Sequence, residues 1–165
     1  MYKIGDKIVY PSYGAGVISA VEEKLIQGIK IKYYVLDIPG STMKVMIPTD
    51  KCVQLGVRDV ISVYEAQELL RRFRDESIED DSSWNKRYRD SISVIRTGDI
   101  FAIAKVLKGL MYREKLKGLS TSERRLFNSV RQMVLSELEL SGIADRKNLE
   151  DIMEDIVAGY DGNTK

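Results

Sequence analysis

The sequence predicts an α+β protein in which a small N-terminal β barrel is followed by a C-terminal all-α helical bundle. Three observations lead to this prediction. Up to about residue 55, short runs rich in β-branched residues are separated by glycine and proline, a pattern typical of strands and turns. From about residue 59 the apolar residues recur at helical spacing. After Pro48 the chain contains no further proline, which favours helices in the second part.

Four stretches before residue 56 are the expected strands of the barrel. The clearest is residues 29–38, IKIKYYVLDI, in which Lys30 and Lys32 alternate with isoleucines as on a half-buried strand. The other three cover residues 7–10, 16–21 and 43–48. Four or five short strands in so few residues indicate a partly open SH3-like or Tudor-like barrel. Such a module usually binds a partner along an edge or through its loops.

Two features of the barrel, the YGAG stretch and Cys52, could suggest a functional site but are expected to be structural. The stretch YGAG, residues 13–16, contains a Gly-x-Gly, but no third glycine follows and no helix opens there. We therefore expect a turn of the barrel rather than a nucleotide-binding loop. Cys52 lies at a strand end in a chain without histidine, so no imidazole base can activate it, and we expect a small core residue.

The second part is expected to form a compact bundle of helices. In one of them, six apolar residues share a face at i, i+3, i+4 and i+7 spacing: Ile100, Ile103, Ala104, Leu107, Leu110 and Met111. Asp99 and Ser120 are the expected N-caps. Gly118 and Gly142 are the expected helix stops. The expected helices cover residues 63–73, 84–96, 99–118, 122–142 and 148–160.

This change of periodicity divides the chain into two domains. We expect a barrel domain over residues 1–56 and a helical domain over residues 57–165. Within the helical domain, the acidic and serine-rich stretch near residues 75–83 is expected to be a loop or connection.

Charge along the helical domain is arranged in blocks. Residues 84–131 hold 12 Lys and Arg against 4 Asp and Glu, a net charge of +8. The preceding residues 56–83 have a net charge of −4, and the following residues 132–165 one of −5. A basic block between acidic ones suggests a surface of limited extent that faces a polyanion. The alternative is that these charges only solvate ordinary helix surfaces.

Composition excludes several classes of function. The chain has no histidine and one cysteine, so zinc sites and Cys–His or Ser–His–Asp catalysis are unavailable. The single cysteine cannot form an internal disulfide and fits a reducing cytoplasm. The acidic pairs Asp80-Asp81 and Glu154-Asp155 do not follow a calcium-loop pattern. We expect no enzyme, no metal and no cofactor, and neither a signal peptide nor a transmembrane helix.

The motif SSWNKRYRD, residues 82–90, contains the chain's only tryptophan. After Trp84 and Asn85 come the basic residues Lys86, Arg87 and Arg89. One interpretation is that Trp84 packs as a staple onto the next helical turn. The other is that an exposed indole leads a helix whose basic side chains hold phosphates. An apolar side chain in that position can then enter a DNA minor groove and partly unstack a base step.

Several stretches along the chain together resemble a known family. In order they are GDKIVYPSYGAGVI, YYVLDI, VMIP, GVRDVI (56–61), WNKRYRD, TGD (97–99), GLSTSERRLF (118–127) and VRQMVLSEL. Their order and spacing over nearly the whole chain resemble the CarD/CdnL family of bacterial RNA polymerase-binding transcription regulators.

The resemblance implies a role for each domain. The Tudor-like barrel would dock on the RNA polymerase β subunit, similar to the polymerase-interacting domain of transcription-repair coupling factor. The helical domain would contact promoter DNA at the upstream edge of the bubble and stabilise the open complex, with weak sequence specificity. Trp84 matches a tryptophan that wedges into the minor groove. The residues expected near the DNA backbone are Lys86, Arg87, Arg89 and Arg124.

At the docking surface, family members often present arginines, and the matching positions here are Lys24 and Met46. We expect a monomer of the bacterial cytoplasm that reaches the nucleoid through RNA polymerase, with no membrane partner. Because the basic block is flanked by acidic ones, we expect poor affinity for DNA alone and dependence on tethering by polymerase.

Two other classes of protein remain open. One is an RNA- or ribosome-binding protein with an SH3-like barrel. The other is a structural adaptor that pairs through the barrel edge. For such an adaptor, Trp84→Ala would change stability rather than activity.

Overall fold

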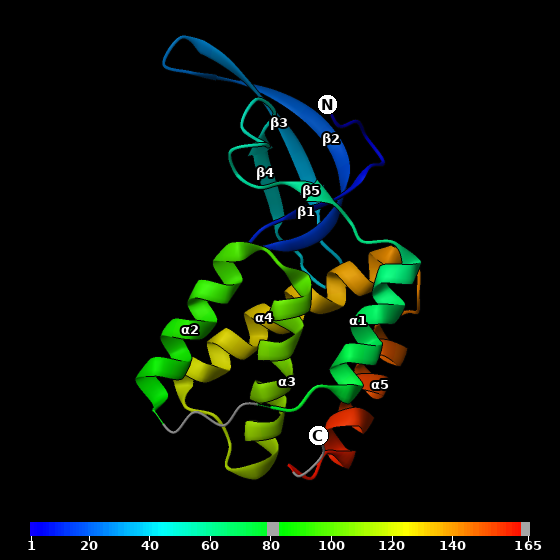
Figure 1. The fold of residues 1–165 in the computed structure, drawn as a ribbon. Helices are drawn as coiled ribbons and strands as arrows, with labels where there is room; N and C mark the ends of the chain where they lie inside the picture. Colours follow the sequence, from blue (N-terminus) through cyan, green and yellow to red (C-terminus); the bar gives the residue numbers. More distant parts are fainter. Residues whose placement is uncertain (79–82, 163–165) are drawn as a thin grey trace.

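The computed structural model describes residues 1–78 and 83–162, with the backbone alone at Trp84, and confirms the α+β fold class (Figure 1). Within these residues, five strands form one antiparallel sheet in the order β4-β3-β2-β1-β5, and five helices follow. The strands are β1 (Lys7–Tyr10), β2 (Gly14–Ile26), β3 (Ile29–Asp37), β4 (Lys44–Pro48) and β5 (Arg58–Asp59). The helices are α1 (Val63–Asp75), α2 (Trp84–Thr97), α3 (Ile100–Leu116), α4 (Thr121–Ser141) and α5 (Arg146–Gly159).

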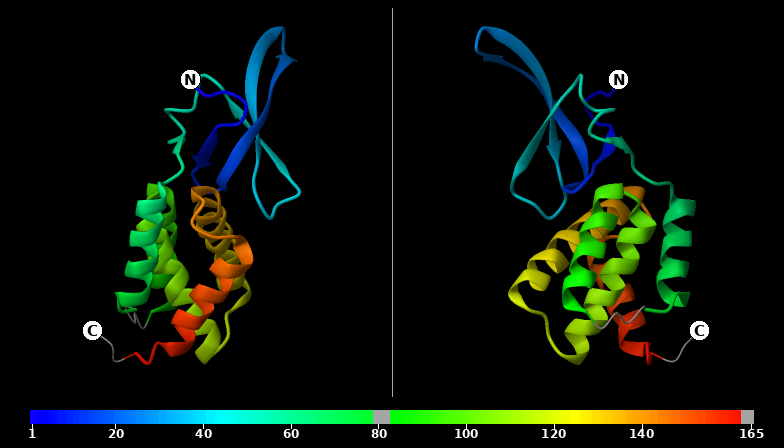
Figure 2. Two further views of the ribbon diagram at one scale, coloured as in Figure 1. Left: turned by 90° about the vertical axis from the view of Figure 1, so that its right-hand side faces the viewer. Right: turned by 60° about the vertical axis from the view of Figure 1, so that its left-hand side comes forward.

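The longest element of the sheet is the β2–β3 hairpin. Its turn is the pair Gln27-Gly28, both with positive φ (51° and 80°), as in the two-residue turns that match strand twist. Toward this turn the hairpin extends beyond its neighbours, because β4 pairs only with residues 33–37 of β3. Figure 2 shows the hairpin projecting away from the helices.

The barrel has a small core of its own. It consists of Ile8, Ile18, Tyr34, Leu36, Ile38, Ile47 and Cys52. Cys52 is therefore a buried core residue, as predicted. The YGAG stretch forms the β1–β2 turn and the start of β2, and no helix opens there. At Gly16 a Cβ atom would lie 2.6 Å from the carbonyl oxygen of Asp37, which explains why glycine is needed at this crossing.

The helical periodicity of the second part is confirmed in detail. Asp99 caps α3 by accepting from the Phe101 N–H at 3.0 Å, and Ser120 caps α4 by accepting from the Glu123 N–H. Gly142 ends α4 with φ 86°, the left-handed conformation that favours glycine. The predicted face of α3 is buried except for Met111, which is half-buried.

A buried lysine of α3 caps a neighbouring helix. Lys108 is 1% exposed, and its Nζ donates to the carbonyl oxygens of Arg74 (3.3 Å) and Glu76 (2.5 Å) at the C-terminal end of α1. The ammonium also lies 4.9 Å from the ring centroid of Tyr160. Burial lowers the pKa of Lys108 below its ordinary value.

Helix α4 contacts the barrel directly. The buried Ser136 Oγ accepts from the Ala15 N–H at 3.0 Å, so the start of β2 is bound directly to the helix. Gln132 Nε2 donates to the carbonyl oxygen of Pro39 at 2.6 Å. Strand β5 pairs with β1 and is thus part of the sheet just past residue 56, while the division of the chain at that residue stays a prediction.

Candidate functional site

Helix α2 places the predicted DNA contacts. Ser83 is its N-cap and accepts from the Lys86 N–H at 3.4 Å, while Gly98 ends the helix with φ 72°. Trp84 is the first residue of α2. Its side chain lies outside the part of the molecule that the structure describes, so the wedge and the staple both stay predictions. The acidic connection predicted near residues 75–83, with Asp80-Asp81, also lies partly outside the described residues.

The three predicted DNA-contact residues of α2 have different surroundings. Lys86 and Arg89 are exposed, and Lys86 Nζ lies 3.8 Å from the carboxylate of Asp90 one turn later. Arg87 is more buried and lies 3.6 Å from the carboxylate of Glu123 on α4. Lys86 and Arg89 therefore face solvent, while Arg87 joins α2 to the start of α4.

Arg124, the fourth predicted cation, lies in the first turn of α4. Its Nη2 contacts both carboxylate oxygens of Glu114 at 2.7 and 2.8 Å, and both side chains remain partly exposed. Since Arg87 and Glu123 join the starts of α2 and α4, the structure brings Arg124 to the same end of the bundle as the α2 cations (Figure 1). We call this set, Lys86, Arg87, Arg89 and Arg124, the basic corner.

Glu123 connects Arg87 of the basic corner to α3 and α4, and the sequence analysis missed it. Its side chain is nearly buried and lies close to both Arg87 (3.6 Å) and Arg113 (3.8 Å). The Ser120 hydroxyl also donates to it at 3.2 Å. Its position as the third residue after the N-cap Ser120, typical of a capping box, is the only local signal that could have found it.

Helix α2 packs on the bundle mainly through partly buried side chains. Among its described side chains only Ile95, near the C-terminal end, is buried. A pocket of about 500 Å³ lies between α2 and α3, lined by Tyr88, Val94, Val106 and Leu110 among others. Tyr88, Ile92 and Val94 pack against the bundle core as partly buried side chains, and the buried Ile95 lies at the end of α2 opposite Trp84.

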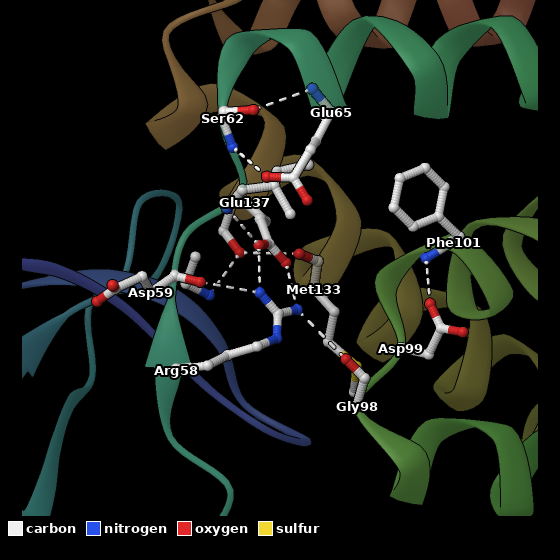
Figure 3. A network of polar contacts seen from close by, with 12 residues as sticks. Arg58, Asp59, Ser62, Glu65, Gly98, Asp99, Phe101, Met133 and Glu137 are labelled. Carbon is white, nitrogen blue, oxygen red and sulfur yellow. Dashed lines mark hydrogen bonds and ion pairs between the residues drawn. The ribbon is translucent and has the colours of Figure 1, made fainter.

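That end is joined to the barrel by an ion pair between the half-buried Arg58 and the buried Glu137 (Figure 3). Arg58 of β5 donates to both carboxylate oxygens of Glu137 on α4, at 2.6 and 2.8 Å. The same guanidinium donates to the carbonyl oxygen of Gly98, the C-cap of α2, at 3.2 Å. Glu137 is 0% exposed and also accepts from the Ile61 N–H at 3.0 Å. Burial alone would lower the pKa of Arg58, but its bonds to Glu137 raise it above the ordinary value.

The barrel presents a second surface. Lys24 lies opposite Ile31, and Met46 lies opposite Val35. Because Ile31 and Val35 are four residues apart on β3, both predicted docking residues share the outer face of the sheet. Lys24 is exposed, and Met46 is half-buried on β4, which is an edge strand of the described sheet. Exposed Ile26 and Ile29 pair with each other and lie on the same face next to the hairpin turn.

Over residues 1–78 and 83–162, no group of His, Cys, Asp and Glu side chains is arranged to hold a metal ion. In the same residues no helix is long and apolar enough to cross a membrane.

The fold and these surfaces define a two-part binding protein: a barrel whose outer face carries Lys24 and Met46, bound to a helical bundle with a basic corner. Residues 2–61 match the CarD-like/TRCF RID domain, and residues 68–154 match the CarD C-terminal domain. Over 148 residues the chain is 36% identical to a Bacillus subtilis (strain 168) protein named "Putative transcription factor YdeB", covering 89% of this chain and 97% of that protein. The chain belongs to the CarD family of transcription factors.

Proposed function

We propose that this protein docks on the RNA polymerase β subunit through its barrel and stabilises the promoter open complex by minor-groove contact at the upstream bubble edge. The match of residues 2–61 to a domain shared with transcription-repair coupling factor supports an interaction with RNA polymerase. The match of most of the helical part to the CarD C-terminal domain supports a role in transcription.

The two proposed binding surfaces lie on different parts of the molecule. The N-terminal ends of α2 and α4, which carry the basic corner, lie on the side of the bundle away from the projecting β2–β3 hairpin (Figure 1). A partner bound to the hairpin and the outer face of the sheet therefore leaves the basic corner open to a second partner. Such separation suits a protein that holds polymerase with one part and DNA with the other.

The mechanism we propose is differential binding. A ligand shifts an equilibrium only by the difference between its affinities for the two states. If Trp84 contacts only the distorted base step at the bubble edge, it supplies such a difference. Stacking of one aromatic side chain on a base contributes about 1–3 kcal/mol, and about 1.4 kcal/mol changes an equilibrium tenfold.

The ion pairs of the basic corner support the proposal that contact with DNA depends on docking to polymerase. Arg124 is engaged by Glu114, and Arg87 lies against Glu123, so phosphates must compete with carboxylates already in place. The free protein is therefore expected to bind DNA weakly. Docking on polymerase supplies a high effective concentration at the promoter, which offsets this weakness without any new contact.

The docking surface that we propose is mainly apolar. Lys24 provides a cation on the outer face of the sheet, while Met46 contributes a thioether on the edge strand β4. Methionine cannot replace the bidentate hydrogen bonds of an arginine, so we propose that an apolar contact replaces an ionic one at this position. We further propose that the protein is a cytoplasmic monomer that reaches the nucleoid with polymerase.

The experiment that tests the DNA role is the lifetime of competitor-resistant open complexes at a ribosomal RNA promoter with the cognate polymerase. Wild type is expected to lengthen the lifetime, and Trp84→Ala is expected to lose this effect. Tyr64→Ala is the matched control, because Tyr64 is an aromatic side chain, 82% exposed, on α1 at the other side of the bundle. Equal lifetimes for wild type and Trp84→Ala would contradict the wedge and favour a structural role for the tryptophan.

The docking role is tested by recovery of polymerase on the immobilised protein. Met46→Asp places a charge on the proposed apolar contact and is expected to abolish recovery of the β subunit. Glu139→Gln on α4, a half-buried position away from the sheet face, serves as the control. Recovery of ribosomal subunits instead of polymerase would favour the RNA-binding alternative.

A further inference from the structure

Three stretches that carried the family resemblance meet at one point of the structure. They are GVRDVI, which contains Arg58, the TGD stretch, which contains Gly98, and VRQMVLSEL, which contains Glu137. Arg58 and Glu137 are 79 residues apart, yet they form a bidentate ion pair that also binds the last carbonyl of α2 (Figure 3). None of these residues belongs to the proposed docking surface or to the basic corner.

The network fixes the end of α2 from several directions. The Arg58 guanidinium stands at the C-terminus of the helix, where the macrodipole favours a cation. Pro11 of the β1–β2 turn lies beside Gly98, since a Cβ atom there would be 3.7 Å from Pro11 Cγ. Ile95, the one buried side chain among those described for α2, is in the same turn of the helix.

The chemistry of the pair favours a single geometry. A guanidinium and a carboxylate that share two parallel hydrogen bonds are fixed in plane and in direction. The Glu137 carboxylate cannot turn toward water, because it is fully buried and also binds the Ile61 N–H. Lysine in place of Arg58 would keep the charge but could not bind Glu137 and Gly98 in the same planar arrangement.

We infer that Arg58 and Glu137 are positioning residues that fix helix α2 relative to the barrel. Docking of the barrel on polymerase thereby sets where the first residue of α2 meets the DNA. This inference rests on the proposed function and deepens it, because it makes the placement of α2 between the two binding surfaces depend on this ion pair, in addition to the hydrogen bonds that join α4 to the barrel.

The length of α2 shows why a small error at this network matters. Its 14 residues span about 21 Å at 1.5 Å per residue. A tilt of about 10° at the C-terminal end moves the N-terminal end by roughly 4 Å. This displacement is about one base-pair step of DNA, which is ~3.4 Å.

The experiment compares three full-length variants with wild type. Arg58→Lys and Glu137→Gln both weaken the network. Arg58→Lys is the milder change, so the comparison can still be made with it if Glu137→Gln fails to fold. Arg131→Lys is the matched control, because Arg131 lies 2.7 Å from Glu150 with an exposed fraction of 34%, against 33% for Arg58, but does not touch the barrel.

Three quantities are measured for each variant. The first is the distance distribution between spin labels at Lys32→Cys on β3 and Ser93→Cys on α2, in a Cys52→Ala background, since both sites are exposed. The second is affinity for the cognate polymerase. The third is the lifetime of the open complex with the unlabelled variant.

We expect Arg58→Lys to broaden the distance distribution, to leave polymerase affinity at the wild-type value and to shorten the lifetime several-fold toward that without factor. Arg131→Lys is expected to match wild type in all three. A distribution as narrow as wild type, or a broad one with an unchanged lifetime, overturns the inference and leaves the proposed function intact. If wild type itself does not lengthen the lifetime, the proposed function fails, and the distance distribution alone decides whether the network fixes α2.

Discussion

Removing the charge of Glu114 is expected to strengthen the binding of the free protein to DNA. Glu114 contacts Arg124 through both carboxylate oxygens, at 2.7 and 2.8 Å. A phosphate that binds Arg124 must therefore displace this carboxylate. Glu114→Gln leaves a neutral side chain of nearly the same shape, so Arg124 becomes available without a change in packing.

The magnitude follows from the exposure of the pair. The side chains of Arg124 and Glu114 are 49% and 36% exposed, so solvent screens their interaction. Exposed ion pairs of this kind contribute about 0.2–1 kcal/mol. Removing such a competitor should tighten DNA binding by about 1.4-fold to 5-fold, since about 1.4 kcal/mol corresponds to a factor of ten.

The assay is fluorescence anisotropy of a labelled forked duplex at several salt concentrations. Glu68→Gln on α1 is the control, because Glu68 also binds two arginines, Arg71 and Arg72, on the side of α3 opposite α2 (Figure 1). These arginines lower the pKa of Glu68 to about 2, so it is charged throughout the assay. Both variants gain one positive unit of net charge, and they differ only in where it is gained.

The two variants separate a local effect from a general one. If Glu114→Gln and Glu68→Gln strengthen binding equally, the gain comes from net charge alone and Arg124 does not meet the DNA. If neither has an effect at low salt while Arg124→Ala weakens binding, DNA reaches Arg124 without displacing Glu114. Either result refutes the idea that the carboxylate limits DNA binding.

Three predictions concern stability. Lys108→Met should lower the free energy of unfolding in urea by about 1–3 kcal/mol, because the buried carbonyls at the end of α1 lose their donor; an unchanged urea midpoint would contradict this. Gly16→Ala should cost about 1–3 kcal/mol through overlap with the Asp37 carbonyl, whereas Gly159→Ala, with nothing within 4 Å, should not destabilise. Burial raises the pKa of the Cys52 thiol above 9.0, so iodoacetamide should alkylate it at pH 9 more slowly than in urea-unfolded protein. The unfolded state then loses its proton first, so this thiol's contribution to stability declines as pH rises above about 9.

Local signals made most of the fold predictable. The helical face that begins at Ile100 and the caps Asp99, Ser120 and Gly142 act within a few residues, so their effect can be read directly from the chain. The end of strand β2 was harder to predict from the sequence. It continues to Ile26, five residues past the predicted end. The side chains there are exposed, so the strand is stabilised by its pairing with β3 and not by burial.

The candidate site was only half predictable. Clustering of basic residues in the sequence pointed to Lys86, Arg87 and Arg89, but not to the carboxylates that face them. Glu123 comes from another helix, and the partner of Arg58 is 79 residues away. Only tertiary packing brings such charges together. One sequence signal was available for Glu137: it is a charged residue between Leu135 and Leu138 in an apolar run, where a buried charge requires a partner.

The hydrogen bond from the Ala15 N–H to Ser136 has a consequence for how the chain folds as it is made. Its two ends are 121 residues apart, and the other bonds between barrel and α4 also join distant positions. At about 5–20 residues per second, α4 is synthesised about 6 to 24 s after the start of β2. The barrel can complete its own small core during that interval, and α4 then docks on a surface that is already folded. We therefore expect the barrel to fold first during translation and the helical bundle to pack against it afterwards.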